Sequence, residues 1–308
     1  MALKLLGYVD LPAHVGQGGF DHAAIDRGRA LLYVAHTAND ALDVIDLRAR
    51  SHARSVPQLN GVAGALVDAA QGLVFTSNRG EDTVGIFRSG AEAGLAKVGV
   101  GARPNGLAYS PEHGILLCAN VGDPSVAAPP SVTLIDVGAR ASISTIVMPG
   151  RTRWTVSDPD QRLFFVNIAD PPLIAVIDPR RPDRIARQSP VPARGPHGLD
   201  LDRSRGRLYC ACDDGALVAL DRATGAIAAR LQLSGPPDVI FLDAARSHLH
   251  VAIGDPGVID VIDVEQWLLA GTVATERGAH TIALDEDRHH VYAFLPGTHR
   301  AAVFEDAV

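Results

Sequence analysis

The chain has 308 residues, of which 47% are hydrophobic and 20% are charged, and its formal net charge is -7. These values are typical of a folded globular protein and argue against disorder. The acidic balance supplies no basic surface for nucleic acid and would repel an anionic membrane, so neither is an expected partner. The first residues hold too few apolar side chains for a signal peptide, and no apolar run reaches the roughly 20 residues of a membrane-spanning helix. The expected location is therefore the cytoplasm.

A pattern of short strands repeats along the chain. Each unit has an apolar stretch that ends in Asp or Ser, a tight turn and a second apolar stretch. In chain order these pairs span 22–36, 64–78, 106–120, 154–168, 198–212, 239–253 and 281–295. The residues that begin the turns are 42, 42, 48, 44, 41 and 42 positions apart, namely Asp26, Asp68, Ser110, Asp158, Asp202, Asp243 and Asp285. Internal periods of this length are typical of repeat architectures and propellers.

Further strands follow each pair. A third segment has aliphatic side chains at alternate positions, as a half-buried strand requires, and a fourth follows in six of the units. Four strands in about 40 to 50 residues is the pattern of a propeller blade. The last unit stops after its third strand, and residues 4–11 have the pattern of the missing fourth. The sequence therefore predicts an all-β, seven-bladed β-propeller, one domain over 1–308, whose last blade is closed by the N-terminal strand.

The repeat resembles a known family. Residues 32–47 (LYVAHTANDALDVIDL) and 74–87 (VFTSNRGEDTVGIF) are similar to the YVTN-type propeller repeats, and the resemblance extends over almost the whole chain. It implies the propeller fold. It does not select a function, because the family includes binding proteins, and a fold of this kind hosts many activities.

The first strand of each blade lines the central channel of a propeller. The residue five positions before each turn residue should begin that strand and face the mouth of the channel. In blade order these mouth residues are Asp21, Ala63, Asn105, Arg153, His197, Asp238 and His280. Five of the seven are ionisable, which marks the mouth as a candidate site.

Four mouth residues are of the metal-ligand type. His197, Asp238, His280 and Asp21 come from consecutive blades five, six, seven and one, so they are expected to converge on one half of the mouth. Imidazole and carboxylate ligands suit a divalent transition metal, and His22 could replace Asp21 as a ligand. The alternative is that these residues form hydrogen bonds around ordered channel water.

The other half of the mouth carries residues suited to an anionic ligand. Arg153 and Asn105 can hold a carboxylate or phosphate, and the adjacent Trp154 can cover an apolar part of the same molecule. Arg153 could instead pair with Asp21 or Asp238 across the channel. The exits of the second strands add His36 and Arg79 as candidates, whereas the asparagines of these exits are expected to form turns.

Two functional hypotheses follow. In the first, the protein is a metal-assisted lyase or hydrolase for a small, polar and anionic metabolite, with His22 or His36 as general base and Arg153 on the anionic group. The segments 195–198 (GPHG) and 278–281 (GAHT) resemble the inner-strand starts of propeller lyases and lactonases, but the ring lacks the Tyr base and the Glu of those enzymes. In the second, the propeller is a non-catalytic binding module for a peptide, a small ligand or a partner protein, through the same face or the Pro-rich loop 122–130.

Overall fold

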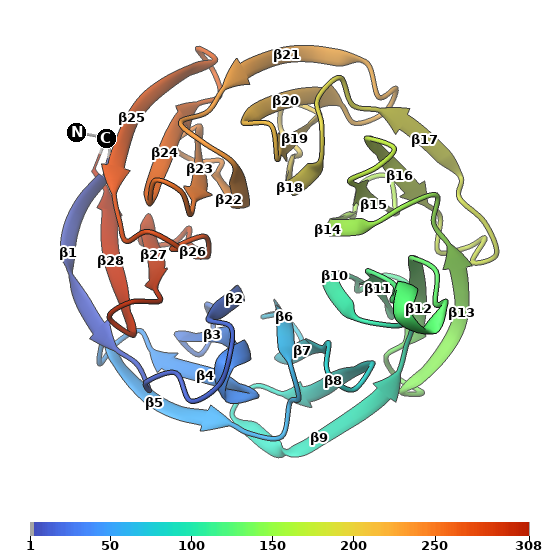
Figure 1. Cartoon of the computed structure of the whole chain (residues 1–308), viewed down its shortest axis with the longest axis horizontal. Coiled ribbons are helices and arrows are strands. Elements are labelled where there is room, and N and C mark those ends of the chain that lie inside the picture. Colours follow the sequence, from blue (N-terminus) through green and yellow to red (C-terminus); the bar gives the residue numbers. More distant parts are fainter. Residues whose placement is uncertain (1–2, 308) are drawn as a thin grey trace.

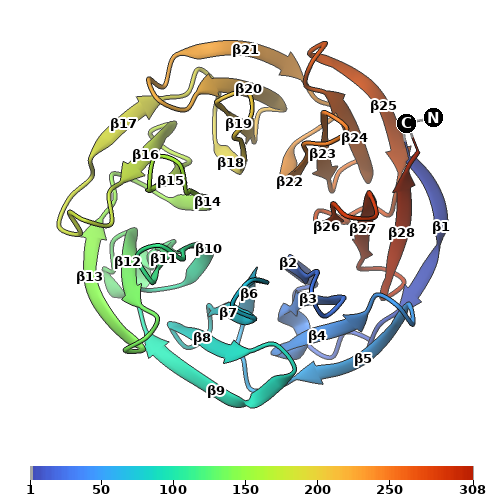
Figure 2. The ribbon, with the colours of Figure 1, turned by 180° about the vertical axis from the view of Figure 1, so that it is seen from behind.

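The computed structural model describes residues 3–307 and consists of seven four-stranded antiparallel sheets. The sheets stand as blades around a central channel, with the first strand of each blade innermost and the fourth on the outer wall (Figure 1). The reverse view shows the same closed ring (Figure 2). The predicted fold class is therefore confirmed. Within this range the helices are two 3-10 turns, η1 (Thr37–Asn39) and η2 (Pro124–Val126), and none is long or apolar enough to cross a membrane.

The strands follow the chain from blade to blade. Blade 1 contains β2 (Phe20–Asp26), β3 (Leu31–His36), β4 (Ala41–Asp46) and β5 (Ser51–Val56), and blade 2 contains β6 (Val62–Asp68), β7 (Leu73–Asn78), β8 (Thr83–Arg88) and β9 (Ala91–Gly99). Blade 3 contains β10 (Pro104–Ser110), β11 (Ile115–Asn120), β12 (Ser131–Asp136) and β13 (Ala141–Val147), and blade 4 contains β14 (Thr152–Asp158), β15 (Leu163–Ile168), β16 (Leu173–Ile177) and β17 (Arg187–Pro190).

The remaining blades complete the ring. Blade 5 contains β18 (Pro196–Asp202), β19 (Arg207–Cys212), β20 (Ala216–Asp221) and β21 (Ile227–Gln232), and blade 6 contains β22 (Pro237–Asp243), β23 (His248–Ile253), β24 (Val258–Asp263) and β25 (Leu268–Ala274). Blade 7 contains β26 (Ile282–Asp285), β27 (His290–Leu295), β28 (Arg300–Asp306) and, from the other end of the chain, β1 (Leu3–Asp10).

The N-terminal strand closes the last blade, as predicted. β1 pairs antiparallel with β28, from Leu3 opposite Asp306 to Asp10 opposite Arg300, and the two strands lie side by side with β1 outermost (Figure 1). The strand begins and ends one residue earlier than the predicted range 4–11. Because β1 covers the free edge of β28, the ring presents no unpaired strand between its first and last blades.

The core consists of apolar layers between neighbouring blades. The middle strands are buried on both faces; in β15, for example, every residue after the first is buried. The outer strands alternate between exposed and half-buried positions, as in β5. Each twisted sheet therefore packs against both of its neighbours. The three cysteines, Cys118, Cys210 and Cys212, are free and buried in these layers.

The Asp that ends the inner strand in every blade except blade 3 stabilises the turn after it. Asp202 accepts a hydrogen bond from the backbone N–H of Arg205 at 2.9 Å, and its other oxygen accepts from the Arg205 guanidinium and from the Tyr209 hydroxyl, both at 3.1 Å. Asp26 contacts Arg29 in the same way. The carboxylate is thus held by the side chain three residues later as well as by the backbone.

The inner strands begin irregularly, and this positions the mouth residues. The register with the second strand shifts between Phe20 and Ala23 in blade 1, and at the matching places in blades 2 to 6. Such irregularities re-aim side chains. A Cβ on Gly106 would lie 2.6 Å from the Arg153 carbonyl oxygen, and one on Gly198 would lie 2.3 Å from that of Asp238. Glycine is therefore required for the next blade's mouth residue to approach this closely.

Candidate functional site

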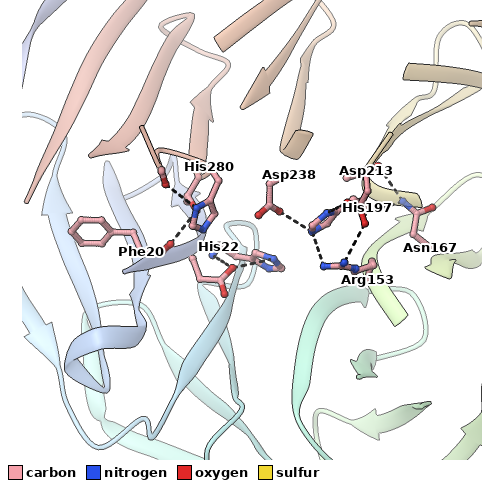
Figure 3. A network of polar contacts seen from close by, with 12 residues as sticks. Phe20, His22, Arg153, Asn167, His197, Asp213, Asp238 and His280 are labelled. Carbon is pink, nitrogen blue, oxygen red and sulfur yellow. Dashed lines mark hydrogen bonds and ion pairs between the residues drawn. The ribbon is translucent and has the colours of Figure 1, made fainter. Parts of the chain in front are cut away.

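His197 is the centre of the polar network at the channel mouth. It is the second residue of β18, and its two ring nitrogens face two carboxylates (Figure 3). Nδ1 lies 2.7 Å from Oδ1 of Asp213, which follows β19 in the same blade. Nε2 lies 3.1 Å from Oδ1 of Asp238, which begins the inner strand of the next blade. The imidazole therefore links blades 5 and 6.

The two carboxylates hold a proton on His197. Burial alone would lower the pKa of His197, but the charge of Asp238 and hydrogen bonds with Asp213 and Asp238 outweigh it and raise the pKa to about 9. Burial alone would raise the pKa of Asp238, but the positive charge of His197 holds this pKa below its usual range. At neutral pH the group is an imidazolium between two carboxylates.

Arg153 contacts the same network from blade 4. Its Nη2 donates to Asp213 Oδ2 at 3.3 Å, and its Nη1 lies 3.1 Å from His197 Nε2. Nε2 of His197 can accept a hydrogen bond from Arg153 only when Nε2 carries no proton. The partner of Arg153 is therefore Asp213, a loop residue that the sequence did not single out, rather than Asp21 or Asp238. If His197 loses its Nε2 proton, Arg153 can take over as hydrogen-bond partner.

Asn167 fixes the backbone beneath His197. Its side-chain Nδ2 donates to the carbonyl oxygens of His197 at 3.0 Å and of Gly198 at 3.1 Å. The residue is fully buried at the end of the second strand of blade 4. The sequence suggested a turn role for the asparagines at these exits, whereas Asn167 links blade 4 to the inner strand of blade 5.

Several arginines gather at the mouth of blades 2 to 4. Burial lowers the pKa of Arg151, and the charges of Arg153, Arg103 and Arg79 lower it further. Arg79 contacts Asp21 only loosely, with Nη2 3.5 Å from Oδ2. Within the described part of the chain, neither Arg103 nor Arg151 forms an ion pair. We call Arg79, Arg103, Arg151 and Arg153 the arginine group.

Buried polar atoms in this half of the mouth lack partners. In the range 3–307, Nε of Arg79, Nε of Arg153 and Oδ1 of Asn105 are buried and form no hydrogen bond. Sequence reasoning found these three residues from the repeat but missed Arg103 and Arg151. Those two lie two positions before the mouth residues Asn105 and Arg153, in the connections that enter the inner strands. Their position two residues before a mouth residue is the sequence signal that could have identified them.

Asp21, His22 and Trp154 come together around the channel axis. His22 Nε2 lies 3.5 Å from Asp21 Oδ1, and the ring centroids of His22 and Trp154 are 4.1 Å apart. Burial lowers the pKa of His22, so its imidazole is neutral at pH 7. Trp154 also packs edge-on against Phe241. The indole therefore fills the channel beneath the mouth, where it contacts His22.

His280 lies beside Asp238 but is held by its own loop. Its Nδ1 donates to the Gly278 carbonyl oxygen at 2.9 Å, and its charge acts on Asp238 (Figure 3). The predicted metal ligands thus share one half of the mouth. In residues 3–307, however, no three His, Cys, Asp or Glu side chains are arranged to hold a metal ion. His197 would have to give up its proton to ligate one, so metal binding here stays a sequence-based prediction.

His36 lies apart from this network. It is fully buried in blade 1, where Nδ1 contacts Asp43 Oδ2 at 2.7 Å and the ring packs against Phe20 and His14. His14 also contacts His299 of blade 7, with ring centroids 4.4 Å apart. The structure thus brings His14 and His299, from opposite ends of the chain, together with His36.

The fold and the mouth define a seven-bladed β-propeller with a charged channel mouth. By sequence, neither a known protein family nor a curated protein matches this chain, so the YVTN resemblance has no support from that side.

Solved structures match its shape. A chain of Kuenenia stuttgartiensis hydrazine synthase has a TM-score of 0.79 at 15% identity and is covered over 98% of its length by 96% of this chain. A chain of a mitotic checkpoint complex has a TM-score of 0.82 at 12% identity, with 98% of this chain and 91% of that chain covered. These likenesses show the fold alone, and two such different proteins do not select a function.

Proposed function

We propose that the channel mouth binds a small anionic molecule. The observation that carries this proposal is the arginine group, in which Arg103 and Arg151 form no ion pair within residues 3–307, and Asp123 and Asp213 act on them only at longer range. The charges of Arg79, Arg103 and Arg153 act unfavourably on that of Arg151, and a bound anion relieves that repulsion. A planar guanidinium also matches carboxylate and phosphate oxygens with paired N–H donors.

The surrounding residues suit an anion of modest size. Arg79, whose ion pair with Asp21 is loose at 3.5 Å, can supply further donors. Asn105 Oδ1 has no donor in the described chain, so a ligand hydroxyl would satisfy it. The best candidates are therefore small carboxylates or phosphates, among which hydroxy acids gain one more hydrogen bond.

Thermal unfolding with a panel of anions tests this proposal. Acetate, succinate, citrate, sulfate and inorganic phosphate would be compared at constant ionic strength. We expect at least one to raise the midpoint of unfolding with a saturating dependence on concentration, because a ligand stabilises the state that binds it. The double variant Arg103→Gln/Arg151→Gln should lose this effect, and the control Arg180→Gln/Arg184→Gln, on the surface of blade 4, should keep it. Identical shifts in all three proteins would show that the anions act elsewhere.

Acid–base catalysis on the bound anion is a second candidate function. The observation that favours it is a pair of histidines near Asp238 whose pKa values move in opposite directions: His22 is neutral and His197 is protonated. Opposed pKa values of this kind fit a general base and a general acid. After His197 donates its Nε2 proton, Arg153 is placed to donate to the vacated nitrogen.

An activity screen on lactones and hydroxy acids tests this second candidate. Ring opening and water elimination would be followed at pH 6 to 9. We expect His22→Gln to abolish turnover while anion binding persists, since His22 lies beneath the arginine group rather than in it. A turnover that survives in His22→Gln would remove the residue from the mechanism.

The metal-assisted form of this chemistry remains a separate proposal. The residues that would hold the ion are His197, Asp238, His280 and Asp21, and a divalent ion there would act as a Lewis acid. Elemental analysis by mass spectrometry tests it. Near-stoichiometric metal in the wild type that is lost in His197→Ala/His280→Ala would support the site, and equal metal in both proteins would contradict it.

A further inference from the structure

The central channel is divided into two compartments. His22 of blade 1 and Trp154 of blade 4 touch across the axis, and Trp154 contacts Phe241 of blade 6. Beneath them is a cavity of about 480 Å³. Its lining reaches from His22 and Trp154 to Arg27 and Arg203, which lie in the turns after the inner strands of blades 1 and 5. None of the seven mouth residues lines this cavity. We call it the lower cavity.

The walls of the lower cavity are mainly apolar and aromatic. Leucine, valine and alanine side chains of the inner strands alternate with the rings of Trp154, Phe241 and Tyr109. The volume falls within the range of about 300 to 1,000 Å³ that is usual for small-molecule sites. Three aromatic rings in one such cavity can contact a flat apolar group or an organic cation.

The charged residues of the lining leave two carboxylates without a cation. Arg27 pairs with Glu286 at 2.9 Å, and Arg203 pairs with Asp160 outside the cavity. Asp68 and Asp200 form no ion pair with any side chain of residues 3–307. The lining therefore has unpaired negative charge in an apolar setting, which is unfavourable until a cation arrives.

Of the two carboxylates, Asp200 has acceptor capacity left for a ligand. Asp200 accepts from the backbone N–H groups of Leu201 and Leu242, each at 2.7 Å, and has no other partner in the described chain. Asp68 uses Oδ1 for the turn amides of Ala70 and Gln71, and its buried Oδ2 has no hydrogen-bond partner. Burial raises the pKa of Asp200 to about 7, as expected for a carboxylate with no neutralising neighbour.

From these observations we propose that the lower cavity binds a small organic ammonium ion with an apolar body. The ammonium group lies by Asp200, and the body lies against Trp154, Phe241 and Tyr109. This site faces the side of the ring opposite the arginine group. It is independent of anion binding at the mouth.

Fluorescence of Trp154 tests the proposal directly. The chain has two tryptophans, so Trp267→Phe leaves Trp154 as the only one. Titration at pH 8 would compare phenethylammonium with 2-phenylethanol, which has nearly the same shape but no charge. We expect the ammonium ion to bind at least tenfold more tightly. Equal affinities, or no change in fluorescence up to millimolar ligand, would overturn the proposal.

Matched variants locate the cation. Asp200→Asn keeps an oxygen acceptor for the backbone, and it should remove the preference for the ammonium ion. Asp238→Asn removes a carboxylate from the mouth and should keep the preference in full. If Asp238→Asn abolishes the preference and Asp200→Asn does not, the cation binds at the mouth and the proposal is wrong.

A measurement on the Trp267→Phe protein alone covers the case in which Asp200→Asn does not fold. Lowering the pH from 8 to 6 protonates Asp200, so the affinity for phenethylammonium should fall severalfold, whereas that for 2-phenylethanol should stay constant. An ammonium affinity that does not change over this range would contradict the role of Asp200.

Discussion

Histidine side chains in this propeller differ in charge because of what their ring nitrogens face. His197 has a carboxylate within hydrogen-bond distance of each nitrogen, and its pKa is raised to about 9 despite burial. His250 is more completely buried, and burial lowers its pKa to about 4, since Asp306 lies 3.4 Å away and neither ring nitrogen is hydrogen-bonded within residues 3–307. Directional hydrogen bonds, rather than the number of nearby charges, separate the two cases.

The proton on His197 depends on Asp213. We expect Asp213→Asn to lower the pKa of His197 by about one unit or more, because it removes a charged acceptor at 2.7 Å. Nuclear magnetic resonance titration of the imidazole Cε1–H signals measures this. Asp214→Asn, which changes the next residue, is the control. A His197 pKa that stays near 9 in Asp213→Asn would show that Asp238 alone holds the proton.

His250 makes the fold sensitive to acid. Its folded pKa of about 4 lies below the unfolded value of 6.5, so the unfolded chain binds the proton first and stability falls as the pH drops from 6.5 towards 4. His250→Phe removes this effect, so the stability lost between pH 7 and pH 5 should be about 2 kcal/mol smaller in the variant than in the wild type. Urea unfolding at pH 7 and pH 5 measures the difference. Parallel losses of stability in both proteins would contradict the assignment.

The candidate site was predictable from sequence only where the repeat places a residue. The offset of five from each turn located His197, Asp238 and Arg153 correctly at the mouth. Asp213 lies in a loop, whose path the strand pattern does not define. The contact of His14 with His299 joins residues from opposite ends of the chain, so it cannot be predicted from residue spacing within one repeat.

At the scale of single elements, strand β1 closes the ring by pairing with β28. Its alternation predicted the strand, and its pairing with β28 followed from the missing fourth strand of the last unit. The shifts of register at the starts of the inner strands were not predictable, because they arise from contacts between blades, such as that of Gly198 with the Asp238 carbonyl oxygen. The alternation of apolar and polar residues within a strand predicts which face of the strand is buried. It does not predict how closely the next blade approaches.

The buried and exposed leucines of β1 contribute unequally to stability. Leu3 is fully buried between blades 6 and 7, whereas Leu5 of the same strand is 45% exposed. We expect Leu3→Ala to lower the free energy of unfolding by about 2 to 5 kcal/mol. Leu5→Ala, the matched control, should change it by less than about 0.5 kcal/mol. Equal effects in chemical unfolding would mean that β1 does not seal the last blade as described.

At the scale of the whole molecule, the ring brings opposite chemistry to its two ends. The mouth concentrates arginines around an imidazolium, and the lower cavity contains unpaired carboxylates among aromatic rings. The repeat predicted seven blades and a channel. It did not predict that His22 and Trp154 divide the channel, because that contact joins blades 1 and 4 across the axis.

The central claim is that the arginine group binds an anion, and calorimetric titration of citrate into the wild type and Arg103→Gln/Arg151→Gln tests it most directly. Charged hydrogen bonds of about 1.5 to 3 kcal/mol each predict at least a tenfold loss of affinity in the double variant. The affinity of the wild type should also weaken as salt is raised. Citrate binding of equal strength in both proteins, or no binding to the wild type at low salt, would contradict the account.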